Sequence, residues 1–291
     1  MLQQLLNGVT LGLLYANVAL GLTLTYGVLK VLHIAHAEIY ALGAYLGLLA
    51  FRASHSVVAS IAAGAAGSAL VGWAVQRWLY RPLLGRPRIV PLIASIGVVI
   101  LMEDLYRLIA GPHVLTYPPA LHLPLYVVGP VVISGAQLLL IGVGLALVLL
   151  MWVALNRTRM GLAWKAVAQD RQVAAAMGIN VNRAIGLNFA VGSAMAGIAG
   201  VLVGMYYNSV SPTMGYMPAY KALAIIVLGG MGSAQGALAA SLLLGLVEEF
   251  SVVSLGRVLP RDSLAFLALI LVLLARPEGI FAWRERGALR P

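Results

Sequence analysis

Residues 134–155 read SGAQLLLIGVGLALVLLMWVAL, a stretch without a single formal charge. A helix needs about 20 mainly apolar residues to cross the hydrocarbon core of a bilayer, so this stretch is long enough to do so. Its apolar and polar residues do not alternate, which argues against a membrane-spanning β-strand of about ten residues. The stretch therefore predicts a transmembrane helix.

The rest of the chain has the same character. Of its 291 residues, 62% are hydrophobic and only 10% are charged, against about 25% charged in a typical soluble domain. Hydrocarbon cannot satisfy backbone N–H and C=O groups, so each long uncharged run has to be helical. We therefore expect an all-α polytopic membrane protein, with about eight transmembrane segments in a single domain over residues 1–291. The expected spans are 5–29, 33–51, 56–76, 90–110, 134–155, 184–206 and a last one that ends near Arg276.

A broken apolar stretch occupies residues 221–247. It is too short to cross a bilayer twice at 1.5 Å per residue. It is either a re-entrant hairpin or two short helices, turning at Gly229, Gly230, Met231, Gly232 and Ser233. Non-helical backbone at membrane depth is tolerated only where protein or a water-filled cavity surrounds it, so we expect a pore-lining role.

Basic residues are concentrated in two connections. Residues 77–88 carry four arginines and no acid, and residues 156–183 carry five basic residues against Asp170 alone. Both connections are expected in the cytoplasm, whereas the uncharged segment 112–133 is expected outside. This arrangement puts the N-terminus outside and the C-terminus in the cytoplasm. It also accounts for the net charge of +10 without a nucleic-acid partner.

Ionisable residues are rare within the spans, so each one is a candidate for function. His36 and Glu38 lie near the start of the second span, with Tyr40 one turn beyond His36. They either make a capping or interhelical hydrogen bond or line the substrate path. Glu103 and Asp104, four and three residues before Arg107, are expected to form a local ion pair with it.

No enzyme or metal signature is present. The chain has no cysteine, and no His, Asp and Glu residues are spaced as a metal site requires. Nucleophile-elbow, zinc-protease, P-loop and dinucleotide motifs are also missing. We therefore expect no cofactor, no metal and no catalytic residue. Gly192, Ala196, Gly200 and Gly204, each four apart, predict a face for close helix packing.

The connection 156–183 is far longer than two helices need to be joined. Asp170 is a candidate N-cap and Gly178 a candidate C′ residue for a helix of about seven residues. Such a short helix does not persist alone in water, so it must pack against its own membrane domain or another subunit.

Several stretches form a familiar pattern. This connection reads AVAQDR at 166–171 and AAMGIN at 175–180. The others are ALGLTLTYG at 19–27, AHAEIYALGAY at 35–45, LGGMGSAQG at 228–236 and RPEGIF at 276–281. Over nearly the whole chain, this order resembles the permeases of ABC importers for branched-chain amino acids, the LivH/LivM family. The length is closest to the LivH-like subunit.

The resemblance implies a permease subunit of an ATP-driven importer in a bacterial or archaeal plasma (inner) membrane. Its implied partners are a second homologous permease, two ATP-binding subunits that bind the ATP, and an extracytoplasmic substrate-binding protein. The chain would itself be no enzyme. Branched-chain amino acids are the leading substrates, with another amino acid, an amide or urea as alternatives. An ion-coupled secondary transporter is the rival class, although it would need paired carboxylates at the midplane, and only Glu38 is close.

The resemblance also implies two groups of site residues. Coupling to the ATPase falls to residues 156–183, in particular to Asp170, Arg171, Ala174, Ala175, Met177, Gly178 and Ile179. The translocation path is expected at His36, Glu38, Tyr40, Gly229, Gly230, Gly232 and Ser233.

Overall fold

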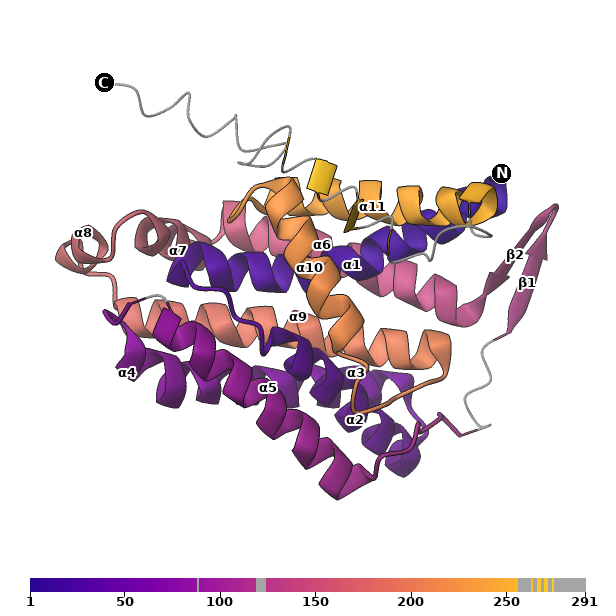
Figure 1. Cartoon of the computed structure of the whole chain (residues 1–291), viewed down its shortest axis with the longest axis horizontal. Coiled ribbons are helices and arrows are strands. Elements are labelled where there is room, and N and C mark those ends of the chain that lie inside the picture. The colour runs from indigo at the N-terminus through magenta and orange to yellow at the C-terminus, as the bar shows by residue number, and fades with distance from the viewer. Residues whose placement is uncertain are drawn as a thin grey trace.

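Figure 1 shows the computed structural model, an elongated bundle of helices. The structure describes residues 1–87, 89–118 and 124–255, together with residues 263, 266, 267, 270, 271 and 274. In chain order the elements are α1 (Leu2–Leu29), α2 (His36–Ser54), α3 (Val57–Ala74), the π-helical η1 (Val75–Tyr80), α4 (Arg81–Leu83), α5 (Ile89–Ala110), β1 (Leu125–Val128), β2 (Val131–Ser134), α6 (Gly135–Arg157), α7 (Arg159–Gln169), α8 (Arg171–Ala176), α9 (Val181–Tyr207), α10 (Tyr216–Gly229) and α11 (Ala234–Leu255). The RPEGIF motif at 276–281 lies outside the described residues, as does most of the last expected span.

The bundle has two distinct ends. One end carries α4, α7 and α8, on the left of Figure 1, and we call it the basic end because both arginine-rich connections lie there. The other carries the N-terminus and the strands β1 and β2, on the right of the figure, and we call it the hairpin end. Helix α1 runs from the hairpin end to the basic end, and α9 runs back beside it.

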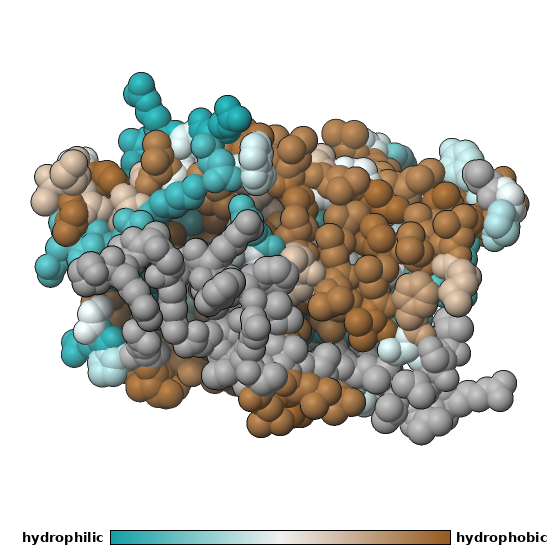
Figure 2. Space-filling view, turned by 90° about the horizontal axis from the view of Figure 1, so that it is seen from above, coloured by the Kyte–Doolittle hydropathy of each residue, from teal (hydrophilic) through white to brown (hydrophobic). Residues whose placement is uncertain are grey.

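Helices α1 and α9 form the centre of the bundle. In their most apolar stretches, 78% of the residues of α1 and 72% of those of α9 are buried, against 17% for α6. The outer helices α3, α5 and α6 therefore leave many of their leucine, isoleucine and valine side chains exposed or only partly buried. Figure 2 shows hydrophobic side chains covering much of one face, with hydrophilic ones gathered toward the basic end. Within the described residues, six helices are long and apolar enough to cross a membrane, against about eight expected segments. The class of all-α polytopic membrane protein is thus confirmed, whereas the number of segments is not.

Glycines let the central helices touch through their backbones. A Cβ added to Gly192 of α9 would lie 2.8 Å from the carbonyl oxygen of Gly21 in α1, and one added to Gly21 would lie 2.6 Å from that of Gly192. Gly200 faces the carbonyl of Tyr40 in α2 in the same way. The prediction that Gly192 and Gly200 belong to a close-packing face is confirmed.

The broken stretch at 221–247 departs from expectation. It turns where the sequence predicts, because α10 ends at Gly229 and α11 begins at Ala234. Only α10 is short, however, whereas α11 has 22 residues and is long enough to cross a membrane. The two-short-helices alternative is thus wrong for the second half. Helix α11 continues past residue 247, where the apolar stretch ends, through Glu248 and Glu249. The carboxylates of these two residues accept hydrogen bonds from Tyr15 and Asn7 of α1, respectively.

The sequence did not predict the β-hairpin or the helix α7. Strands β1 and β2 form an antiparallel hairpin in which Val128 pairs with Val131. The side chain of Gln3 binds the hairpin backbone at Val132, accepting from its N–H at 2.9 Å and donating to its carbonyl at 3.1 Å. In the basic connection, α7 precedes the expected short helix. The buried Trp164 of α7 donates from Nε1 to the carbonyl of Ala184 at 3.0 Å, which ties α7 to its own bundle.

Candidate translocation path and coupling helix

The chain between α1 and α2 re-enters the bundle without helical structure. Helix α1 ends at Lys30, which is in the left-handed conformation with φ of 58°. The chain then folds back along α1, and α2 begins only at His36. The His36 ring lies so close to Gly21 that a Cβ there would be 2.8 Å from its Nε2 atom. Gly21 is eight residues before the end of α1, about 12 Å at 1.5 Å per residue. Helix α2 therefore starts at depth, inside the bundle.

Two buried histidines lie at this interruption. His33 is 1% exposed, and its Nδ1 atom lies 2.7 Å from the hydroxyl of Tyr80 in η1. Its ring also packs 5.3 Å from that of Phe189 in α9, measured between ring centres. His33 and His36 both border a narrow cavity of about 10 Å³ whose far wall comes from Ala219, Ala222 and Leu223 of α10. That volume holds about one water molecule.

Glu38, in the first turn of α2, is fully buried. Its backbone carbonyl accepts a hydrogen bond of 2.7 Å from the hydroxyl of Tyr106 in α5. Within the described part of the chain, neither carboxylate oxygen of Glu38 has a hydrogen-bond partner. A buried carboxylate without partners is costly, so Glu38 stays a candidate for function.

The expected ion pair on α5 is present, and it reaches further than the sequence indicates. Arg107 binds Glu103, and it also donates to Asp104 Oδ1 at 2.9 Å. Glu103 in turn accepts a hydrogen bond from the hydroxyl of Tyr216, the first residue of α10. This hydrogen bond links the start of α10 to α5.

The structure divides the residues predicted for the path into two places. His36 and Glu38 lie at the interruption, with Tyr40 one turn beyond, buried and facing α9. The turn between α10 and α11 lies nearer the basic end, where Gly232 approaches Gly27 of α1. It is the body of α10, at Ala219, Ala222 and Leu223, that joins His36 at one cavity.

The backbone conformation and packing of the turn between α10 and α11 explain its residue types. Gly230 and Gly232 have φ of 93° and 92°, which other residues rarely adopt,. Gly229 packs directly on the backbone of Gly236. The Ser233 hydroxyl accepts from the N–H of Gly236 at 3.1 Å. These facts explain the turn, and its role in transport stays a prediction.

The short helix α8 forms as the sequence predicts. Asp170 caps it, because its Oδ1 atom accepts from the N–H groups of Gln172 at 2.7 Å and Val173 at 2.9 Å. Gly178 ends the motif in the left-handed conformation with φ of 82°. The helix has two faces. Ala174 is buried and Ile179 half-buried against the bundle, whereas Ala175 and Met177 are exposed, Met177 by 78%.

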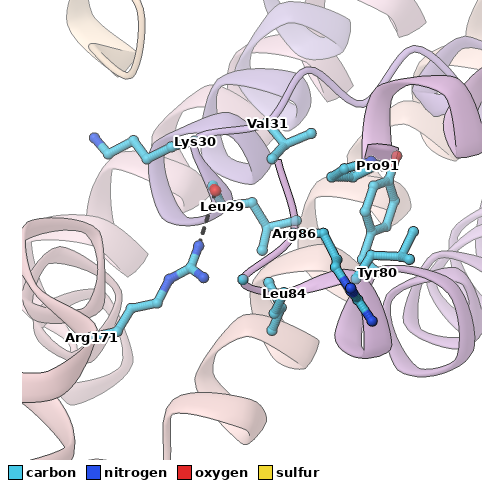
Figure 3. A pocket seen from close by; sticks show the side chains of 10 residues that line it. Leu29, Lys30, Val31, Tyr80, Leu84, Arg86, Pro91 and Arg171 are labelled. Carbon is cyan, nitrogen blue, oxygen red and sulfur yellow. Dashed lines mark hydrogen bonds between the residues drawn. The ribbon is translucent and has the colours of Figure 1, made fainter. Parts of the chain in front are cut away.

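Arg171 attaches α8 to the end of α1. Its guanidinium donates to the carbonyl oxygens of Val28 at 3.2 Å and Leu29 at 2.9 Å, as Figure 3 shows for Leu29. These carbonyls belong to the last turn of α1, where a cation is favoured by the helix dipole. Partial burial lowers the pKa of Arg171 from its ordinary value. A displacement of α8 would therefore pull directly on α1.

The sequence analysis missed a buried charge cluster. Lys221 of α10 lies 3.0 Å from Glu248 of α11, and its Nζ atom donates to the Tyr15 hydroxyl of α1 at 2.7 Å. The Tyr15 hydroxyl donates to the same carboxylate at 2.8 Å. One signal was available: Lys221 stands alone between two long uncharged runs. Its partner, 27 residues away on another helix, could not be read from local spacing.

A bundle of apolar helices, interrupted at depth beside buried polar groups, has the architecture of a membrane permease. The family described as branched-chain amino acid transport system / permease component matches residues 4–275. The chain belongs to this family.

Individual relatives agree along almost the full length. The chain is 38% identical to the high-affinity branched-chain amino acid transport system permease protein BraD of Pseudomonas aeruginosa, covering 98% of this chain and 96% of that protein. It is 36% identical, with the same coverage, to LivH of Escherichia coli. The resemblance to the LivH-like subunit is confirmed.

Two more distant comparisons add detail. LivM of Escherichia coli is 32% identical over 47% of this chain and 33% of its own length. LivH and LivM together indicate a second permease subunit in a multicomponent transporter. The solved structure of PsaBC from Streptococcus pneumoniae in complex with Fab has a TM-score of 0.53 at 15% identity, covering 99% of this chain and 95% of that one, which supports the fold alone.

Proposed function

We propose that the chain is the LivH-like permease subunit of an ATP-driven importer for branched-chain amino acids, in a bacterial or archaeal inner membrane. The observation that carries the proposal is the full-length similarity to BraD and LivH, both named for this transport. Related amino acids, amides or urea are the alternative substrates. ATP-binding subunits and an extracytoplasmic binding protein complete the proposed assembly.

The interruption at His36 supports a path in this region. Two chain segments, the start of α2 and the body of α10, meet there with backbone and side-chain polarity at depth. His36, Glu38 and Tyr40 are proposed to border the path, and α10 to move relative to them. Because α10 is short and turns on the glycines 229, 230 and 232, it can shift without breaking a full-length span.

The coupling proposal assigns α8 to a groove of an ATP-binding subunit. Its exposed face, at Ala175 and Met177, is available to a partner, and methionine adapts readily to an apolar surface. Its inner face and Arg171 connect it to α1. Closure of the ATPases would then move α1 and, through the contact of Gly21 with Gly192, α9.

Reconstituted uptake tests the proposal. The permease with its co-purified partners in proteoliposomes should import labelled leucine, isoleucine and valine only with ATP and binding protein. Uptake that persists without ATP and collapses when ion gradients are dissipated would favour the ion-coupled rival. Selective uptake of an amide or urea would change the proposed substrate but keep the proposed class, an ATP-driven importer.

Cysteine labelling tests the proposed orientation in this cysteine-free chain. Val127 of the hairpin and Met177, the residue after α8, are 72% and 78% exposed. In intact cells an impermeant thiol reagent should label Val127→Cys and reach Met177→Cys only after the membrane is opened. The opposite pattern would invert the orientation.

A further inference from the structure

A second cavity lies at the basic end, apart from the proposed translocation path. It measures about 150 Å³ and lies between the end of α1, the connection after η1 and the first turn of α5. Figure 3 shows its lining, with Leu29 and Val31 on one side and Tyr80 and Pro91 on the other.

The charged residues at this cavity all have the same sign. Lys30, Arg86 and Arg171 line it, and no acidic side chain is among its described lining residues. Arg171 is held in place by the α1 carbonyls, whereas Lys30 and Arg86 are exposed and extend to opposite sides of the rim in Figure 3. Both are long side chains that can turn toward an anion beside the fixed guanidinium, and phosphate is a preferred ligand of such groups.

The interior of the cavity is apolar. Leu29, Val31, Leu84 and Pro91 contribute hydrocarbon to its walls. An apolar cavity of roughly 150 Å³ takes up benzene, so this one has room for about six carbons. A free phosphate ion would leave these walls unused, whereas an amphiphile with an acyl chain would fill them.

Large hydrophobic side chains are exposed on the elements that border the cavity. On η1, Trp78 is 74% exposed, and on the first turn of α5, Ile89 is 56% exposed. Tryptophan is enriched at the membrane–water interface, at the level of lipid headgroups. Basic pockets between membrane helices at this level bind anionic headgroups.

We infer that this cavity binds one anionic phospholipid. Its phosphate is held by Lys30 and Arg86, and the first carbons of one acyl chain lie between Leu29, Val31 and Leu84. Because Arg171 belongs to α8, the bound lipid braces the coupling helix against α1. The binding itself does not depend on which substrate the permease carries.

Lipid titration of the purified full-length chain, followed by native mass spectrometry, tests the inference. Phosphatidylglycerol should bind more tightly than phosphatidylcholine with the same acyl chains. Lys30→Gln with Arg86→Gln should weaken phosphatidylglycerol binding about 30-fold, since each cation near a lipid surface contributes about a factor of 5. Arg157→Gln with Arg159→Gln removes two exposed cations at the same end, outside the cavity lining, and should leave binding unchanged.

A third variant separates the lipid from a free anion. Leu84→Trp fills the apolar part without removing a charge and should weaken phosphatidylglycerol binding, and inorganic phosphate should not displace the lipid. Only variants whose melting temperature equals that of the parent protein are compared, which excludes misfolding as the cause of weaker binding. Equal binding of both lipids, equal losses in the two double variants, or displacement by inorganic phosphate with no effect of Leu84→Trp would each overturn the inference.

Discussion

Helices α6 and α9 are both long and apolar, yet they differ in what they face. Helix α6 is an uncharged, leucine-rich helix up to its last residue, Arg157, and in its most apolar stretch only 17% of the residues are buried. Helix α9 carries Asn188 and Ser193, both buried, among several glycines. In a soluble protein the more apolar helix would be the inner one. Here the bilayer accepts the apolar helix, and the interior keeps small and polar residues.

The same contrast separates two ion pairs. Lys221 and Glu248 lie inside, with the carboxylate side chain fully buried, whereas Arg107 and Asp104 on α5 are 44% and 66% exposed. Removing one partner of a buried pair leaves an uncompensated charge, which costs far more than losing a surface pair. The interior should thus be where substitutions have large effects.

The largest effect is expected from Lys221→Met. It removes the cation that pairs with the buried Glu248 carboxylate and should cost about 3–5 kcal/mol, seen as a large drop in melting temperature in detergent. Asp104→Asn, the matched outer variant, should cost at most about 1 kcal/mol. The double variant Lys221→Met with Glu248→Met should regain much of the loss, because no charge is left unpaired. Equal melting temperatures of the two single variants would contradict the contrast between the buried and the exposed ion pair.

A smaller effect is expected from glycine substitution. Gly192→Leu forces a side chain into the backbone of Gly21 and should cost about 1–3 kcal/mol or more. Gly142 of α6 has no atom within 4 Å of an added Cβ, so Gly142→Leu should leave stability unchanged. Melting curves in detergent compare the stability of the two variants. If Gly142→Leu destabilised the protein as strongly, α6 would have to be packed against an unseen partner.

Local rules predicted the parts of this structure that depend on neighbours in sequence. They found most of the long helices, but not α11 as a full-length one, and they found the caps of α8 at Asp170 and Gly178 and the pairing of Arg107 with Glu103 and Asp104. They could not find the pairing of Lys221 with Glu248, because it joins different helices. They also placed the start of the second span at residue 33 instead of His36, because residues 33–35 are as apolar as the helix that follows. The depth at which a helix begins depends on tertiary packing, which the local sequence does not show.

The smallest effect on stability, and the sharpest effect on coupling, is expected on α8. Ala174 is buried against the bundle and Ala175 is exposed, so bulk at these adjacent positions tests two different surfaces. Ala174→Trp should lower the melting temperature of the isolated permease, because it overpacks the contact with the bundle. Ala175→Trp should melt like the parent, since surface substitutions usually change stability by less than about 0.5 kcal/mol.

Ala175→Trp should nevertheless weaken retention of the ATP-binding subunits in a pull-down, or separate their hydrolysis from uptake. The two alanines are adjacent and identical in size, so a difference in outcome can only come from the surface that each one faces. If Ala175→Trp retained both the subunits and substrate-stimulated hydrolysis, the exposed face of α8 would not be the contact. The coupling role would then have to pass to the Arg171 side of the helix, where α8 is joined to α1.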